Sequence, residues 1–460
     1  MPRLPPLRSP PSEPPTPTRG PLGAAVWALA WPTLVTNVLL SATGLINLIF
    51  VGRLGKDALA VVGMSEQFVF LLFSIVTSVS VGTSALVARS IGAEDLEQAE
   101  AVSRQSLVMC LLGGLLSTLL MRYLGPAVLK VMNAQGAILA TGSEYLRILS
   151  WLQIQVFAII VVGAIYRGFG DSRTPMYIML ATNAVQIAAD FCLIYGRFGC
   201  PKMGVLGAAW SWWISRTLGG VLSVVLLARS PLSGCLKGDW RPDWSWFRRV
   251  WAIGLPTAIQ QTVRTTASMV FFGILGHLPN GAASVAALTI GLRIESIAFM
   301  PGFAFGMSAI TMVGQNLGAK QVDRAERAGW ICAWQAMAMM GAAGVLFLTV
   351  PRFILHLFTS DPEVVPLGVG YLRANGLAQP ALSLGIALTG AMQGAGETRI
   401  PAWITFVTMW VIRVPLTHLL ADRAHMGTNV AWAVQAFTNI LYGVAIVFLY
   451  RSGRWKRNRI

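Results

Sequence analysis

Charged side chains are scarce in this chain. They make up 12% of its residues, whereas a soluble globular domain carries about 25%. Hydrophobic residues make up 55%, so too few charges remain to cover a water-exposed surface, and a soluble multidomain enzyme or a disordered protein is excluded. Cysteine is scarce as well, and its scattered, odd-numbered positions exclude a disulfide scaffold or a cysteine metal site. We expect small apolar core residues at Cys110, Cys192, Cys200, Cys235 and Cys332.

Sequence motifs for catalysis are also missing. No phosphate-cradling Gly-x-x-x-x-Gly-Lys-Ser/Thr loop occurs, which argues against ATP as the direct energy source. The four histidines fall at predicted span ends or in loops, without partners at ligand or acid–base spacing. We therefore expect no metal site, no cofactor and no enzyme activity, with a membrane-embedded enzyme as the competing class. The histidines are His277, His356, His418 and His425.

Long apolar stretches dominate what is present. Stretches of about 20 residues, the length that crosses a bilayer core, recur between short polar breaks. We predict twelve spans, at 24–51, 58–88, 102–123, 143–166, 175–196, 203–228, 250–276, 282–313, 327–350, 367–392, 400–421 and 427–450. The first 23 residues hold nine prolines, which predicts a disordered, solvated tail. The first apolar stretch has the length of a span and no small-residue cleavage site follows it, so we expect it to be a membrane span and not a cleavable signal peptide.

The basic residues predict the orientation of these spans. With both termini in the cytoplasm, the inner segments hold 21 Lys and Arg residues and the outer segments hold 8. Because Lys and Arg concentrate on the cytoplasmic side of membrane proteins, we expect both termini there. The net charge of +16 is then explained by topology and by contact with lipid headgroups, and not by nucleic acid.

One segment of the sequence is written twice. Tyr-Leu-Arg at 145–147 returns at 371–373, and Gly-x-Gly-acid-x-Arg-x-Pro at 168–175 returns at 394–401, both 226 residues later. Each copy contains six spans, an even number, so the copies enter the membrane in the same orientation around an axis along the membrane normal. A cleft between two such bundles predicts secondary transport. The predicted parts are a cytoplasmic tail at 1–23, an N-lobe at 24–229, a cytoplasmic linker at 230–249, a C-lobe at 250–452 and a basic cytoplasmic tail at 453–460.

Several motifs carry a family resemblance. They are the proline of span one followed by Val-Gly-Arg-Leu-Gly at 51–55, Ala-Arg-Ser-Ile-Gly-Ala at 88–93, Val-Gly-Gln-Asn-Leu-Gly-Ala at 313–319, Arg-Gly-Phe-Gly-Asp at 167–171 with Arg-Thr-Pro at 173–175, and Arg-Val-Pro at 413–415. Together they resemble the multidrug and toxic compound extrusion (MATE) transporters over residues 24–452. The resemblance implies an all-helical, V-shaped pair of six-helix lobes that exports cationic or amphipathic compounds in exchange for protons or sodium.

An acidic residue in span five is the candidate for ion coupling. A carboxylate inside the hydrocarbon region costs about 2.5 to 3.5 kcal/mol on insertion scales, so each one is a candidate functional group. Asn183, Gln186 and Asp190 stand at i, i+3 and i+7, on one helical face. This stripe either binds a proton or sodium ion or serves as a hydrogen-bonded structural group. The resemblance implies the coupling role, because N-lobe-coupled members carry an aspartate at this place.

The sequence also departs from that family pattern. Asn47 stands where the family has a second aspartate, in span one, and Gln186 stands where asparagine is usual. A further position, often threonine, corresponds to Trp212. With one carboxylate instead of two, a sodium site is weakened, because a hard cation prefers several anionic oxygens. We therefore predict proton coupling by Asp190 with Asn47, Gln186 and Asn183, and keep sodium as the alternative.

Span seven raises a second question. The resemblance places Arg264 where C-lobe-coupled members have glutamate, and Leu382 where they have the partner aspartate, so that C-lobe site is absent. Gln260 or Gln261, Arg264 and Ser268 form a stripe predicted to face inward. An intramembrane arginine stays charged, so it needs a counter-charge. Glu66 or Glu295 would pair with it, or it would bind an anionic or zwitterionic substrate.

Pro32 lies inside span one and should kink it, because it removes a backbone hydrogen bond. The kink is either a hinge, as the resemblance implies, or static packing. We expect an exporter that works as a monomer in a bacterial inner membrane, in contact with lipids, and that takes amphipathic small molecules into a cavity. The residues expected at the cavity are Arg264, Gln260, Gln261, Glu66, Glu295 and Trp212. The alternatives are a flippase for lipid-linked precursors and an exporter of anionic or zwitterionic metabolites.

Overall fold

The computed structural model describes residues 17–457, and nearly all of this range is helical, without a strand. The predicted tail at 1–16 and the end of the basic tail at 458–460 lie outside the described residues. In chain order the α-helices are α1 Leu22–Gly52, α2 Lys56–Gly92, α3 Leu96–Val131, α4 Gly136–Ser150, α5 Gln153–Phe169, α6 Arg173–Tyr195, α7 Val205–Ala228, α8 Trp244–Gly276, α9 Gly281–Gly318, α10 Val322–Thr349, α11 Pro351–His356, α12 Val364–Gly394, α13 Arg399–Phe406, α14 Val414–Thr417 and α15 Thr428–Arg451. Two short 3-10 helices, η1 Ser233–Leu236 and η4 Arg454–Arg457, and two π-helical stretches, η2 Val407–Arg413 and η3 His418–Arg423, complete the chain.

These helices form twelve membrane-length units, which correspond to the twelve predicted spans. α4 and α5 make one unit with a bend of 48°, and α13, η2, α14 and η3 run on as a single unit, Arg399–Arg423. In the described chain, ten units are long and apolar enough to cross a membrane, counting the bent pair as one. The other two are α8 and α12. Polar side chains such as Gln260 and Gln261 in α8 and Asn375 and Gln379 in α12 lower their hydropathy.

The bend between α4 and α5 interrupts the predicted span at 143–166. The hydroxyl of Thr118 in α3 donates to the carbonyl of Ser150 at 2.9 Å, and the Gln153 amide donates to the carbonyl of Leu149 at 3.1 Å. Both carbonyls lie in the last turn of α4. A helix kinks where side chains enter its hydrogen-bond ladder in this way.

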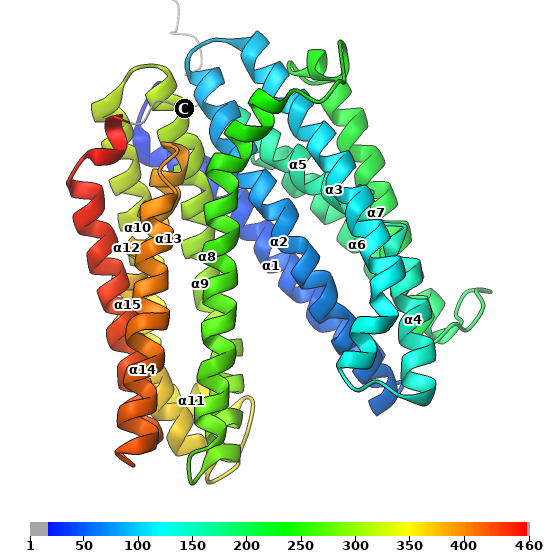
Figure 1. Cartoon of the computed structure of the whole chain (residues 1–460), viewed down its shortest axis with the longest axis vertical. Coiled ribbons are helices and arrows are strands. Elements are labelled where there is room, and N and C mark those ends of the chain that lie inside the picture. The colour runs from blue at the N-terminus through cyan, green and yellow to red at the C-terminus, as the bar shows by residue number, and fades with distance from the viewer. Residues whose placement is uncertain (1–16, 458–460) are drawn as a thin grey trace, which may run out of the picture.

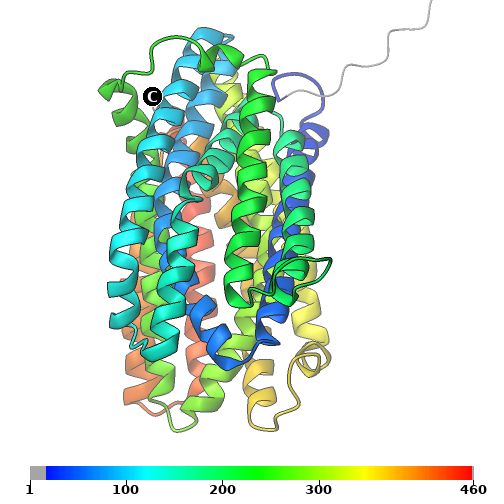
Figure 2. The ribbon, with the colours of Figure 1, turned by 90° about the vertical axis from the view of Figure 1, so that its right-hand side faces the viewer.

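The twelve units are arranged as two lobes whose helices run along the long axis of the molecule (Figure 2). α1 to α7 form the N-lobe and α8 to α15 form the C-lobe, and the lobes diverge toward one end to give a V shape (Figure 1). The predicted fold class is thereby confirmed.

The first helix of each lobe also packs into the other lobe. Val26 and Leu29 of α1 lie in the core of the C-lobe, whereas Val51 of the same helix lies in the core of the N-lobe. α8 does the reverse, with Val250 in the N-lobe core and Leu275 in the C-lobe core. The lobes are therefore not packed independently on either side of the predicted linker at 230–249, because α1 and α8 each bury apolar residues in both lobes.

The lobes meet where α2 and α9 end, through pairs of residues related by the repeat. A Cβ added at Gly92 would lie within 3.0 Å of the Gln315 carbonyl oxygen, and a Cβ added at Gly318 would lie within 3.0 Å of the Arg89 carbonyl oxygen. Positions 89 and 315, like 92 and 318, are separated by the repeat offset of 226. The two contacts are therefore related by the sequence repeat. We call the end of the molecule where the lobes touch in this way the closed end.

The described parts of both termini pack at this same end. The Pro17 carbonyl accepts a hydrogen bond from Asn316 at 3.0 Å, and the Gly20 carbonyl accepts one from Arg324 at 2.8 Å. Two backbone carbonyls of this segment are thus bonded to α9 and α10, while residues 19–21 are exposed. At the other terminus Trp455 is buried and stacks on Tyr450.

The segment between α7 and α8 is shorter than predicted, because α8 begins at Trp244 and not at 250. Asp243 caps this helix by accepting a hydrogen bond from the Ser245 amide at 2.8 Å. Hydrogen bonds from Ser245 lower the pKa of the exposed Asp243 carboxyl.

The cysteines are only partly as expected. Cys110, Cys235 and Cys332 are buried, whereas Cys192 and Cys200 are partly exposed, and all five are free thiols.

Candidate functional site

A cavity of about 820 Å³ lies between the lobes and is lined by residues of both. Five of the six residues expected there line it: Glu66, Trp212, Gln260, Gln261 and Arg264. Glu295 does not, which corrects that expectation. Its side chain is buried inside the C-lobe, with 2% of its surface exposed.

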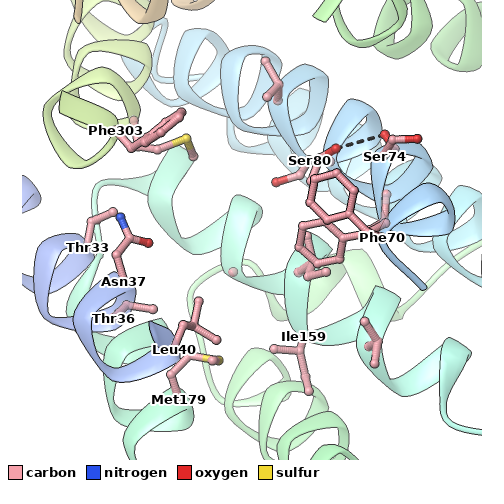
Figure 3. Close-up of a pocket in the computed structure, with 18 of the residues that line it drawn as sticks. Thr33, Thr36, Asn37, Leu40, Phe70, Ser74, Ser80, Ile159, Met179 and Phe303 are labelled. Carbon is pink, nitrogen blue, oxygen red and sulfur yellow. Dashed lines mark hydrogen bonds between the residues drawn. The ribbon is translucent and has the colours of Figure 1, made fainter. Parts of the chain in front are cut away.

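Figure 3 shows how α1 contributes to this cavity. Thr33, Thr36, Asn37 and Leu40 lie on successive turns of α1 and face the cavity, with Phe70 and Ser80 of α2 across from them. Pro32 lies inside the helix directly before this stretch. The lining therefore begins where α1 leaves the core of the C-lobe.

Asp190 of α6 is fully buried beside the cavity and meets two hydrogen-bond donors. Asn47 of α1 donates to one carboxyl oxygen at 3.2 Å, and the hydroxyl of Ser211 in α7 donates to the other. Among residues 17–457 no lysine, arginine or histidine lies within 4.0 Å of this carboxyl group. Three helices thus hold a carboxyl group to which no cation is paired.

The other two residues of the predicted stripe lie on the same buried face of α6, and among the described residues neither forms a hydrogen bond with Asp190. Gln186 accepts a hydrogen bond from Arg216 at 3.4 Å and also lines the cavity. Asn183 is buried, and neither atom of its side-chain amide has a partner in the described chain. The predicted stripe is therefore one buried polar face of α6, and among the described contacts Asn47 of α1 bonds to only one of its three members, Asp190.

Ser211 and Arg216 were missed in the sequence. The hydroxyl of Ser211, the neighbour of Trp212 in the chain, donates to Asp190, while Trp212 lines the cavity and its ring lies beneath the guanidinium of Arg216. Adjacent residues on a helix point about 100° apart, so a shift of one position selects a different face. Arg216 could have been found as an intramembrane charge in span six.

The predicted ion pair of Arg264 is not formed. Within the described residues, neither Glu66 nor Glu295 comes within 4.0 Å of Arg264. The Arg264 guanidinium lies over the ring of Tyr442, 5.9 Å from its centroid. A cation–π contact of this kind leaves the guanidinium hydrogen-bond donors available.

Glu295 belongs to a second buried polar network, in the C-lobe. The hydroxyl of Tyr371 donates to its carboxyl group, and Gln435 contacts the Tyr371 hydroxyl at 3.4 Å. Asn375 accepts from Gln435 and from Asn439, both at 3.4 Å. The network ends at Arg413, whose guanidinium donates to Asn439 at 2.5 Å and to Thr438 at 2.8 Å.

Removing the Tyr371 hydroxyl should destabilise the C-lobe. We expect Tyr371→Phe to lower the free energy of unfolding by about 1 to 3 kcal/mol, because a buried acceptor then loses its donor. Thermal unfolding of the detergent-solubilised protein measures this. Tyr123→Phe is the control, since Tyr123 is 69% exposed. An equal melting temperature for Tyr371→Phe and the control would contradict the assigned hydrogen bond.

Two six-helix lobes around a shared cavity define a membrane transporter. A family model described as MatE matches residues 32–192 and 256–419. The chain is 30% identical over 436 residues to the "Probable multidrug resistance protein NorM" of Thermotoga maritima, covering 94% of this chain and 93% of that protein. The chain therefore belongs to the MatE family, the multidrug and toxic compound extrusion transporters.

The chain is also similar to a further relative and to two solved structures, at lower identity. "Multidrug resistance protein PmpM" of Pseudomonas aeruginosa is 26% identical over 94% of this chain and 91% of that protein. A multidrug resistance MATE family transporter of the MOP superfamily, solved in an outward-facing conformation, matches with a TM-score of 0.87 at 22% identity, over 96% of this chain and 98% of that one. A MOP superfamily transporter from Pyrococcus furiosus, whose title describes a binding pocket of reverse polarity, matches with a TM-score of 0.86 at 21% identity over the same shares. At these identities the structures show a common fold.

Proposed function

We propose that the protein exports amphipathic small molecules by alternating access, in exchange for protons that bind at Asp190. The observation that carries the proposal is a carboxyl group with 0% exposure and no cation within 4.0 Å in the described chain, directly behind the cavity wall. A buried unpaired charge is costly, and binding a proton removes it. The names of NorM and PmpM, which call those relatives multidrug resistance proteins, support export of foreign compounds.

Asn47 connects the proposed proton-binding residue, Asp190, to the substrate cavity. It donates to Asp190, and it also lines the cavity. A change in the protonation of Asp190 therefore alters a group that substrate can touch. Proton and substrate shift the transporter between states only through their different affinities for those states, so the two exclude each other in the cycle.

The two prolines of the crossing helices support a hinge. Pro32 follows Ala30, which is buried in the C-lobe core, and precedes Thr33, which lines the cavity. In α8, Pro256 likewise stands between Ile253 of the N-lobe core and Thr257 of the cavity. A proline weakens the helix where it sits, so each crossing helix can bend where it leaves the opposite lobe.

The direction of opening follows from the positive-inside topology. The closed end carries the basic ends of the helices, among them Arg89, Lys320 and Arg324, which is typical of the cytoplasmic side. In this proposal the termini are cytoplasmic, the cavity opens outward, and the protein resides in the plasma membrane of a bacterium in contact with its lipids. One chain supplies both lobes and the cavity lining, so a monomer is sufficient.

Efflux from proteoliposomes tests the proposal. The purified protein is reconstituted, a fluorescent amphipathic dye is enclosed, and either a pH gradient or a sodium gradient is imposed. An acidic exterior should accelerate release, and a sodium gradient should not, because a single carboxylate offers few of the anionic oxygens that a hard cation prefers. Equal release under either gradient, or without one, would remove ion coupling.

Ser211 should affect the coupling as well. We expect Ser211→Ala to slow proton-driven efflux about tenfold, because a hydrogen bond to a charged group contributes about 1.5 to 3 kcal/mol. Ser215→Ala is the control, since Ser215 is buried one turn further along α7 and bonds only to the carbonyl of Trp212 among the described contacts. Equal rates for the two variants would show that the bond between Ser211 and Asp190 has no part in transport.

A further inference from the structure

The cavity carries an excess of positive charge. Its lining contains three arginines, Arg167 of α5, Arg216 of α7 and Arg264 of α8, and one carboxylate, Glu66 of α2. All other lining side chains are neutral. With three positive groups and one negative group, the lining has a formal net charge of +2.

None of the three arginines is neutralised by a carboxylate. The ion pairs within 4.0 Å in the described chain involve other residues. Arg216 donates weakly to the Gln186 amide oxygen at 3.4 Å, and Arg167 contacts the Ser80 hydroxyl at 3.5 Å. Within residues 17–457, the buried Nε of Arg167 has no hydrogen-bond partner. The guanidinium charges of the cavity are thus available to a ligand.

The remaining wall suits a flat apolar body. Phe70, Phe157, Phe303 and Trp212 face the cavity from both lobes. Aromatic side chains stack on flat rings, and about 820 Å³ is within the usual range for drug-sized ligands. Arginine donates two parallel hydrogen bonds to a carboxylate, sulfonate or phosphate group, which lysine cannot match.

We propose that the cavity selects amphipathic anions, with the acid group held by Arg216 of the N-lobe and Arg264 of the C-lobe and the apolar body held by the aromatic wall. The inference rests on the proposed function, because it names the substrate class of the same cavity. Two guanidinium groups without a carboxylate partner attract an anion and repel a cation, so the cavity should bind anions in preference to cations.

The sign of the substrate charge changes the driving force. Exchange of a monovalent cation for a proton moves no net charge. Export of an anion carries negative charge outward, and the proton taken up in exchange carries positive charge inward. Both steps therefore move net charge in the same electrical direction. An interior-negative membrane potential therefore accelerates anion export and leaves cation exchange unchanged.

Two xanthene dyes of opposite charge test the inference in proteoliposomes that contain the full chain. Carboxyfluorescein is the anion and tetramethylrhodamine methyl ester is the cation. Under an acidic exterior we expect the wild type to release carboxyfluorescein at least about tenfold faster than the cation, and faster still with an interior-negative potential. Arg264→Gln and Arg216→Gln should each slow carboxyfluorescein release about tenfold, while Arg264→Lys restores part of it. Arg352→Gln, an exposed arginine outside the cavity lining, should release the dye like the wild type.

The outcomes separate this inference from the proposed function. Acid-driven release of the cation in preference to the anion overturns the anion inference and leaves the exporter standing. Arginine-dependent release of the anion that ignores the pH gradient supports the inference and contradicts proton coupling. Release of neither dye above protein-free liposomes overturns both. Unchanged carboxyfluorescein release in Arg264→Gln and Arg216→Gln overturns the assignment of the acid group to these arginines, and thermal unfolding checks that both variants are folded.

Discussion

Asp190→Asn is expected to abolish proton-driven export. Asparagine keeps the size of the side chain, and its single carbonyl oxygen can still accept one of the two hydrogen bonds that Asn47 of α1 and Ser211 of α7 donate to Asp190. It cannot bind a proton. A ligand shifts a conformational equilibrium only through its different affinities for the two states, so the ratio of efflux with a pH gradient to efflux without one should fall to about one.

Glu295→Gln is the matched control for this experiment. Glu295 is also a buried carboxyl group in a membrane-length helix, but it lies in the C-lobe, away from the cavity lining, and bonds to Tyr371. We expect Glu295→Gln to keep a ratio of efflux with a pH gradient to efflux without one that is well above one. A gradient response that survives in Asp190→Asn would remove Asp190 from coupling, and a loss in both variants would extend coupling to the C-lobe.

Gly92→Ala is expected to block closure of the lobes at the end that holds the termini. A Cβ at this position would come within 3.0 Å of the backbone of Gln315, and backbone cannot turn aside as a side chain can. Overpacking of this kind costs about 1 to 3 kcal/mol. That cost falls only on the state in which these residues touch, so it should reduce the population of that state about 5- to 150-fold.

Spin labels on α2 and α9 near this end would measure the change as a longer distance between the lobes, and efflux should fall in parallel. Gly318→Ala should have the same effect, because Gly318 meets the Arg89 backbone in the symmetry-related contact. Gly63→Ala is the control on the same helix, since nothing lies within 4 Å of its Cβ position. If Gly92→Ala kept both the label distance and the efflux rate of the control, the contact would not limit closure.

Much of the fold was predictable from the sequence. A membrane span must satisfy its backbone hydrogen bonds internally and face lipid, so each one appears as a long apolar run. The repeat at 226 residues then predicted two similar lobes. The crossing of α1 and α8 into the opposite lobes left no signal, because a helix that packs in two cores is apolar along its whole length in either arrangement.

The candidate site was predicted in part. Helical spacing placed Asn183, Gln186 and Asp190 on one buried face, and all three are buried. The partner Ser211 on α7 was not predicted, and of the two roles considered for Arg264, an ion pair or substrate binding, the ion pair does not form among the described residues. Both outcomes have one cause, which is that the rotation of each helix about its axis is set by packing against its neighbours.

The sequence by itself determined the membrane character, the twelve spans, the duplication and the presence of one acidic residue in span five, since hydropathy and repeats are properties of residues close together or at a fixed offset in the chain. Only the tertiary structure decided that Asn47, 143 positions away, and Ser211 meet Asp190, that Glu295 is buried inside the C-lobe, and that Arg167 and Arg216 line the cavity together with Arg264. Contacts between distant helices depend on how each helix is rotated and tilted when all twelve pack together. No local pattern of residues encodes that arrangement.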